Sequence, residues 1–202
     1  MSFFENTRKP VGLGGKIMVA MMNFGHSAMA AWGLPFLQPA QDAMVLDCGC
    51  GGGANIKTLL KLCPKGRVQG IDYSAVSVEK ARKVNARAIA AGRCNVQQAS
   101  VTELPFEAEQ FDAVTAFETV YFWPELAQNF REVYRVLKPG GIFFICNEAN
   151  GETAKDDKWT QIINGMTIYT DTALKAYLEQ AGFCKIQSHK SKKGWLCVTA
   201  RK

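Results

Sequence analysis

The stretch VLDCGCGGGANI, residues 45–56, leads from a short apolar run through a cluster of glycines into a segment with helical potential. An acidic residue, Asp47, lies two positions before Gly49, the first glycine of the cluster. Because glycine carries no side chain, a turn of this kind brings backbone N–H groups close to a nucleotide-like ligand. These residues therefore predict a strand, a ligand-binding turn and a helix.

The rest of the chain continues this alternation of strand and helix. Strands are expected at 43–47, 67–72, 95–98, 111–117, 142–146, 184–188 and 195–199, and helices at 54–62, 76–91, 173–180 and from Pro124 to a stop at 139–141. The pattern predicts an α/β fold: a Rossmann-like, doubly wound, mostly parallel seven-stranded sheet with helices on both faces. Ligands bind beyond the carboxyl ends of the strands in such sheets. The polar strand ends, Asp47, Asp72, Glu118 and Asn147-Glu148, are therefore expected to meet at one edge.

Composition places the chain among ordinary globular proteins. It has 202 residues, 48% of them hydrophobic and 21% charged, which suits one domain. Much of the net charge of +6 comes from lysines and arginines in residues 185–202. We interpret them as a solvated basic edge, and attraction to nucleic acid is the alternative.

The seven cysteines are odd in number and scattered through apolar segments. This pattern predicts reduced thiols, a cytoplasmic location and no metal site. Nothing in the sequence indicates an oligomeric state.

The N-terminal segment resembles a signal peptide at first sight. Residues 17–41 carry no charge and follow Arg8, Lys9 and Lys16. The solidly apolar part, 17–22, is however too short for a membrane span. We therefore expect residues 1–41 to form a helical lid over an apolar pocket in the domain of residues 42–202.

The glycine turn alone fits more than one cofactor. Gly49-x-Gly51-x-x-Ala54 is a loose dinucleotide fingerprint, and Asp72 stands about 20 residues further on, where such folds carry the acid that binds ribose hydroxyls. Any cofactor that bears adenosine satisfies this pattern. A nicotinamide-dependent oxidoreductase is therefore one alternative.

Further motifs narrow the choice. VLDCGCGGG is followed by GIDYS at 70–74, ELPFEAEQFDAVTAFETVYFW at 103–123 and REVYRVLKPGGIFFI at 131–145. In this order and spacing they resemble the class I S-adenosylmethionine-dependent methyltransferases, in particular small-molecule enzymes such as those of quinone pathways. The resemblance covers about residues 43–147 and implies S-adenosylmethionine as the cofactor.

The resemblance also implies which residues bind this cofactor. The backbone at Gly49 and Gly51 would approach its methionine portion, with Asp47 fixing the turn and assisting at the ammonium end. Asp72 would hold the ribose hydroxyls, and Tyr73 would pack beside the adenine.

The adenine contact departs from the pattern. Family members with an LPF motif often carry an aspartate where this chain has Ser100, whose hydroxyl is a weaker acceptor than a carboxylate. The N–H of Val101 is expected to reach the adenine ring, and Phe117, at the end of its strand, to touch the cofactor.

Catalytic residues are harder to identify from the sequence than cofactor-binding residues. Methyl transfer from a sulfonium is an in-line displacement, so positioning supplies much of the catalysis and a general base is needed only for some acceptors. His26, on the lid, is the candidate base, and Glu118 and Tyr121 are expected to face the methyl group or the acceptor. Packing roles are the alternative for all three.

The acceptor is expected to be a small, partly apolar molecule, because the lid is apolar and carries few charges. Met166, Ile168 and Tyr169, in the long connection 149–170, are expected to close the pocket from a second side. The chain has no Asn-Pro-Pro-Tyr stretch, so nucleic acid is not the expected partner. An RNA or protein methyltransferase and a non-catalytic cofactor-binding module are the alternatives.

Overall fold

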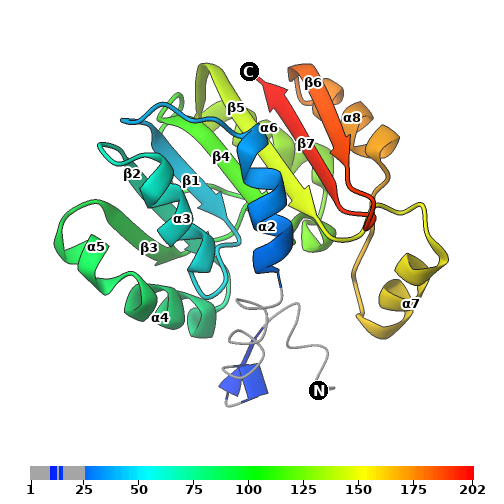
Figure 1. The fold of residues 1–202 in the computed structure, drawn as a ribbon, viewed down its shortest axis with the longest axis horizontal. Coiled ribbons are helices and arrows are strands. Elements are labelled where there is room, and N and C mark those ends of the chain that lie inside the picture. Colours follow the sequence, from blue (N-terminus) through cyan, green and yellow to red (C-terminus); the bar gives the residue numbers. More distant parts are fainter. Residues whose placement is uncertain (1–9, 13, 16–25) are drawn as a thin grey trace.

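The computed structural model describes residues 10–12, 14–15 and 26–202, and its centre is a seven-stranded sheet (Figure 1). The strand order is β3-β2-β1-β4-β5-β7-β6. The strands are β1 Met44–Cys48, β2 Arg67–Asp72, β3 Cys94–Gln98, β4 Phe111–Phe117, β5 Leu137–Asn147, β6 Cys184–Lys190 and β7 Leu196–Arg201. All pairs are parallel except those of β7, which runs antiparallel to both β5 and β6. The mostly parallel seven-stranded sheet is thus confirmed.

Helices cover both faces of this sheet (Figure 1). The longer ones are α3 Ala54–Leu62, α4 Ala75–Val84, α6 Leu126–Val136, α7 Ala154–Ile162 and α8 Asp171–Gln180, and the shorter are α2 Ser27–Gly33, η2 Leu34–Phe36, α5 Ala86–Ala90 and η3 Val120–Phe122. The buried sides of α2, α3 and α4 pack on one face, and those of α6 and α8 pack on the other. This is the doubly wound arrangement that the alternating elements predict.

Two predicted helices end differently in the structure. The helix expected at 76–91 is wrong as a single element, because it breaks at Asn85 into α4 and α5. The Asn85 amide Nδ2 donates to the carbonyl oxygens of Gly53, at 3.0 Å, and Ala81, at 2.9 Å, and so joins the end of α4 to the glycine turn. Leu137, expected in the helix that begins near Pro124, instead starts β5 and pairs with Phe111.

The long connection at 149–170 contains α7, a helix that was not expected from the sequence. Thr170 caps the start of α8, because its hydroxyl accepts from the Ala173 N–H at 3.2 Å. No helix among the described residues is both long and apolar enough to cross a membrane. All seven cysteines are free, and all but Cys184 are buried.

Candidate active site

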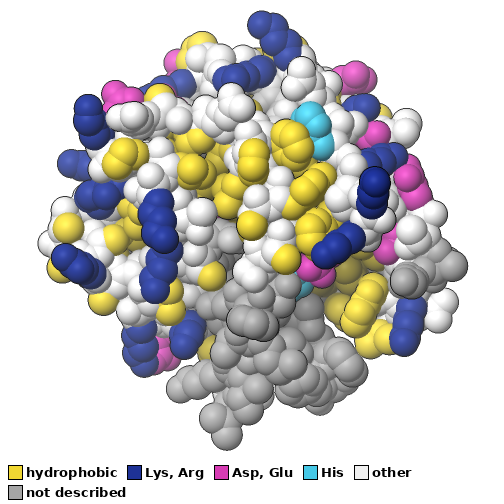
Figure 2. Space-filling model, in the orientation of Figure 1, with side chains coloured by type: hydrophobic (Ala, Val, Ile, Leu, Met, Phe, Trp, Pro, Cys, Tyr) yellow, Lys and Arg dark blue, Asp and Glu magenta, His cyan; other side chains and the backbone are white. Residues whose placement is uncertain are grey.

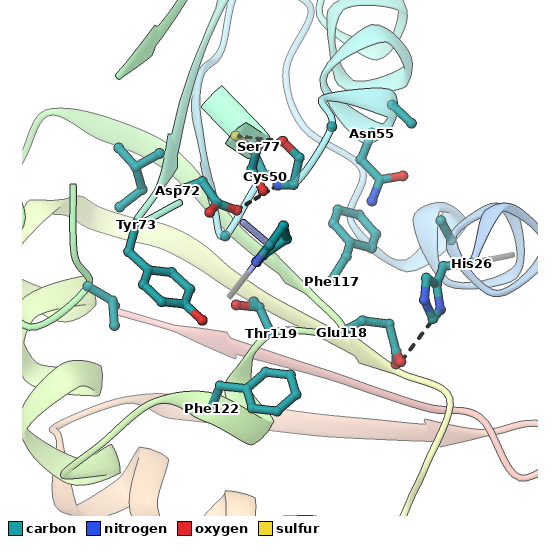
Figure 3. Close-up of a pocket in the computed structure, with 18 of the residues that line it drawn as sticks. His26, Cys50, Asn55, Asp72, Tyr73, Ser77, Phe117, Glu118, Thr119 and Phe122 are labelled. Atoms are coloured by element: carbon teal, nitrogen blue, oxygen red, sulfur yellow. Dashed lines mark hydrogen bonds and ion pairs between the residues drawn. The ribbon is translucent and has the colours of Figure 1, made fainter. Parts of the chain in front are cut away.

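A pocket of about 420 Å³ opens at the carboxyl ends of the central strands. The glycine turn after β1, the end of β2, the loop after β3, the loop after β4 and the buried side of α2 all contribute to its wall. Figure 3 shows Asp72 and Tyr73 on one side and His26 and Glu118 on the other, with Phe117 between them. The edge at which the strand-end residues meet is the one expected from the sequence.

The glycine turn is held by backbone hydrogen bonds to β2. The N–H groups of Gly49 and Cys50 both donate to the carbonyl oxygen of Ile71, at 2.9 and 2.8 Å. Gly49 and Gly51 have φ angles of +75° and +51°, values that glycine adopts without strain. A Cβ at Gly49 would lie 2.2 Å from the Thr119 hydroxyl, whereas a Cβ at Gly51 would have no atom within 4 Å. Packing therefore requires the first glycine, and the second leaves open space at the pocket wall.

This difference predicts unequal effects of two substitutions. Gly49→Ala is expected to lower the free energy of unfolding by about 2–4 kcal/mol, because a clash adds to the left-handed backbone strain. Gly51→Ala should cost only about 1 kcal/mol, from backbone strain alone. Urea unfolding of both variants measures the two losses, and equal losses would contradict the packing role of Gly49.

Asp72 connects the end of β2 to the glycine turn. One carboxylate oxygen accepts from the Gly51 N–H at 2.9 Å, and the other accepts from the Ser74 N–H at 2.8 Å. Burial raises the pKa of Asp72, and the two backbone hydrogen bonds oppose that rise. The carboxylate lines the pocket, where the sequence predicts it.

Asp47 lies outside the pocket wall. One of its oxygens accepts from the Thr115 hydroxyl at 2.8 Å, and the other has no hydrogen-bond partner among the described residues. Burial raises the pKa of Asp47 to about 7. The structure therefore puts Asp47 in the sheet interior, with no direct hydrogen bond to the turn that it was expected to fix.

The remaining predicted cofactor residues line the pocket: Tyr73, Ser100, Val101 and Phe117. The Ser100 hydroxyl already accepts from the N–H of Thr102 at 3.2 Å and from its hydroxyl at 2.8 Å. Because these local bonds occupy its acceptor sites, Ser100 is a weaker partner for a ligand than the aspartate common at this position. The departure from the family pattern therefore matters in the structure too.

A cluster of two carboxylates and one imidazole forms the other end of the site. His26 precedes α2, Glu118 follows β4 and Glu148 follows β5. The His26 Nδ1 lies 3.6 Å from Glu118 Oε2 and 3.5 Å from Glu148 Oε1, and the three ligand atoms lie within 4.8 Å of one another. Such a set of nitrogen and oxygen atoms is also one that divalent cations accept, although the cysteine and histidine spacing in the sequence predicts no metal site.

Glu118 is held tightly in this cluster. Its φ of +58° is left-handed, a conformation that costs a non-glycine residue of order 1 kcal/mol and recurs at functional sites. Its Oε1 accepts from the Tyr121 hydroxyl at 3.1 Å and from the Glu148 N–H, which leaves Oε2 directed toward His26. Burial raises the pKa of Glu118 to about 7, against the opposing effect of His26.

The pKa of His26 is raised as well. Burial by itself lowers it, but the nearby carboxylates of Glu148 and Glu118 outweigh that effect. Among the described residues of the pocket wall, none is lysine or arginine. The site is therefore formally acidic at both ends, with Asp72 at one and Glu118 at the other.

Tyr121 lies behind the pocket wall and supports Glu118 from there. It is buried, and its hydroxyl contacts Glu118 and the Ala149 N–H, the latter at 3.0 Å. The expectation that Tyr121 itself faces the acceptor is not met, because its side chain does not line the pocket.

The segment with Met166, Ile168 and Tyr169 does not line the pocket either, contrary to expectation. The Thr167 N–H donates to the Tyr121 carbonyl at 2.9 Å, so this segment packs behind the loop that carries Glu118.

Several wall residues were not singled out from the sequence. Asn55, in the first turn of α3, and Thr119, beside Gly49, both line the pocket. The Thr119 hydroxyl also accepts from the Trp123 indole at 3.1 Å. The sequence could have indicated both residues, because Asn55 follows the glycine turn and Thr119 follows β4.

The N-terminal segment reaches the site at both of its described ends. Ala30, Ala31 and Leu34, of α2 and η2, line the pocket. Pro10 lines it as well, and its carbonyl accepts from the Ser74 hydroxyl at 2.8 Å. Asn23, a polar residue of the same segment in the sequence, lies outside the described residues.

A mostly parallel seven-stranded sheet with a glycine turn bonded to an acid at the end of β2 defines an α/β protein that binds an adenosine-bearing cofactor. Residues 46–145 match the methyltransferase domain family. The chain accordingly belongs to the class I S-adenosylmethionine-dependent methyltransferases, and S-adenosylmethionine is its cofactor.

Curated relatives include 24-methylenesterol C-methyltransferase 2 of Arabidopsis thaliana, 29% identical over 70% of this chain and 38% of the relative. Another is the O-methyltransferase cnsE of Penicillium expansum, 30% identical over 73% of this chain and 54% of that protein. The chain thus spans about two-fifths to half the length of these relatives.

Among solved structures, a SAM-dependent methyltransferase from Aquifex aeolicus superposes with a TM-score of 0.76 at 18% identity, over 92% of this chain and 97% of that one. Haemonchus contortus phosphoethanolamine N-methyltransferase 2, in complex with S-adenosyl-L-methionine, has a TM-score of 0.80 at 15% identity, over 100% and 60% of the chains. At these identities the likeness concerns the fold.

Proposed function

We propose that the protein transfers a methyl group from S-adenosylmethionine to a small, partly apolar acceptor. The observation that carries this proposal is a single pocket with the glycine turn and Asp72 at one end and His26 and Glu118 at the other. Relatives named as sterol and O-methyltransferases support an acceptor of this size and polarity. When bound, the cofactor supplies a methyl group on a positively charged sulfur.

The residues of the turn fit this cofactor. The open space beside Gly51 lets a ligand approach the backbone, and the Asp72 carboxylate at the wall is suited to accept hydrogen bonds from two ribose hydroxyls. We assign the adenine to the side of Tyr73 and Val101, and the methionine portion to Gly49 and Gly51. Asp47, which has one oxygen without a partner in the described part of the chain, acts from beneath as a buried negative charge or acceptor.

The remaining wall positions the acceptor. His26 and Glu118 are the acid–base pair: His26 is the base expected from the sequence, and Glu118 has a raised pKa, of about 7, that also suits it to accept a proton. Tyr121 is a positioning residue that orients Glu118. α2 and η2, within the proposed lid of residues 1–41, cover the pocket with Ala30, Ala31 and Leu34 and so exclude water. An apolar cover of this kind favours an acceptor with an apolar body.

The surface gives the nucleic-acid alternative little support. Lys190, from the basic C-terminal part, pairs with Glu152 and Asp171. On the face of the molecule drawn in Figure 2, lysine and arginine side chains are spread widely, and apolar side chains occupy the middle. A gathered basic stripe would be expected of a nucleic-acid binder.

The first test is a calorimetric titration of the full chain with S-adenosylhomocysteine and, in parallel, with NAD. Micromolar binding of the first and none of the second is expected, after which radiolabelled methyl transfer to small acceptors can be screened. Binding of NAD with no binding of S-adenosylhomocysteine would refute the proposal.

A further inference from the structure

The cluster of His26, Glu118 and Glu148 carries a net negative charge, and no described lysine or arginine forms an ion pair with either carboxylate. Even when His26 is protonated, two carboxylates face one cation. An acceptor with a carboxylate or phosphate would approach Glu118 without meeting a lysine or arginine of the described wall. Two like charges about 4 Å apart repel by about 4 kcal/mol near a protein surface, so anionic acceptors are disfavoured.

The distances in the cluster indicate what would fit it. At 3.5 and 3.6 Å, the two contacts of His26 Nδ1 are longer than charge-assisted hydrogen bonds, which are about 2.7–2.9 Å, and Nδ1 has no partner at that shorter distance among the described residues. Glu118 Oε1 is already used by Tyr121 and by the Glu148 backbone, but Oε2 faces the imidazole. Three acceptor atoms on three different elements thus converge.

We propose that this cluster binds the acceptor's amino group, and that the acceptor is therefore an amine with an apolar body. A primary ammonium has three N–H donors, which match Glu118 Oε2, Glu148 Oε1 and neutral His26 Nδ1. The apolar body lies against α2 and η2, at Ala30, Ala31 and Leu34. This inference rests on the proposed function and specifies its substrate class.

The amine must lose a proton before it can attack. The proton passes from the ammonium to the Glu118 carboxylate or to His26, which frees the nitrogen lone pair. A nitrogen–carbon bond then forms as the carbon–sulfur bond of the cofactor breaks, so the positive charge moves from sulfur to the methylated amine. The raised pKa of Glu118, about 7, suits a carboxylate that accepts a proton near neutral pH.

The proposal is tested by titrating phenylalkylamines into the full chain saturated with S-adenosylhomocysteine. Phenethylamine is compared with 2-phenylethanol and 3-phenylpropanoate, which replace the ammonium by a hydroxyl and a carboxylate. We expect the amines to bind at least 10-fold more tightly than the alcohol, and the acid not to bind. If no amine of the series binds more tightly than its alcohol, the proposal is overturned, whereas loss of S-adenosylhomocysteine binding would refute the proposed function instead.

Glu148→Gln is the deciding variant, because Glu148 is partly exposed and glutamine keeps its volume while removing its charge. It should weaken amine binding at least 10-fold and leave S-adenosylhomocysteine binding unchanged. Glu179→Gln, on the exposed side of α8, is the control of equal charge change. Unchanged amine affinity in Glu148→Gln overturns the proposal. So does micromolar Mn²⁺ or Zn²⁺ binding that Glu148→Gln abolishes, which would identify a metal site.

Discussion

Asp72→Ala is expected to weaken binding of S-adenosylhomocysteine by about 100-fold or more. Two charge-assisted hydrogen bonds to ribose hydroxyls contribute about 1.5–3 kcal/mol each, and 100-fold corresponds to about 2.7 kcal/mol. The substitution also leaves the N–H groups of Gly51 and Ser74 without their acceptor, so the glycine turn loses its side-chain bond to β2, while the backbone bonds of Gly49 and Cys50 to Ile71 remain. Both effects lower affinity.

The measurement is a calorimetric dissociation constant together with urea unfolding of the same sample. Asp72→Asn keeps the shape and one acceptor oxygen, and should recover stability more than affinity. Asp42→Ala removes an equally charged but exposed carboxylate just before β1 and should change neither. A dissociation constant within about twofold of wild type in folded Asp72→Ala would remove Asp72 from the cofactor site.

Much of the fold could be predicted because most central strands are continuous apolar runs. The bounds of β2, β4 and α3 agree with those expected from the sequence. The errors occurred where a tertiary contact overrides a local pattern. Leu137 continues the apolar spacing of α6, yet it pairs with Phe111 as part of β5. A buried leucine fits a helix and a strand equally well, so its apolar side chain does not distinguish the two. Asn85 looks like a solvated helix residue, but its amide binds the turn at Gly53.

The cofactor end of the site was more predictable than the acceptor end. Asp72 and Gly51 follow strands directly, so topology alone brings them to the pocket. Whether a side chain faces the pocket or the interior after the strand ends depends on the turn that follows. The left-handed backbone at Glu118 directs its carboxylate toward His26 and leaves Tyr121 behind it, and no periodicity in the sequence encodes this.

Glu118→Gln should lower kcat by about 100-fold, the usual scale for loss of an acid–base group. The amide cannot accept a proton, although it preserves the volume and the contact with Tyr121. His26, Glu148 and Tyr121 are the titratable groups packed around Glu118. For the wild type, kcat/KM is expected to rise as pH increases through about 7, because the active form is the ionised carboxylate and its pKa is raised. This rising limb of the pH profile should disappear in Glu118→Gln.

Tyr121→Phe separates catalysis from packing in the same experiment. The Tyr121 hydroxyl donates to Glu118 and lowers its pKa, so its loss should move the limb to higher pH and reduce kcat by about 10-fold. If Tyr121 had only a structural role, Tyr121→Phe would lower the free energy of unfolding and leave the rising limb at the same pH.

His26→Gln is the companion variant. If the rising limb persists in His26→Gln and vanishes in Glu118→Gln, the titrating base is the carboxylate of Glu118. If it vanishes in His26→Gln alone, the base is the imidazole, and Glu118 only holds it in position.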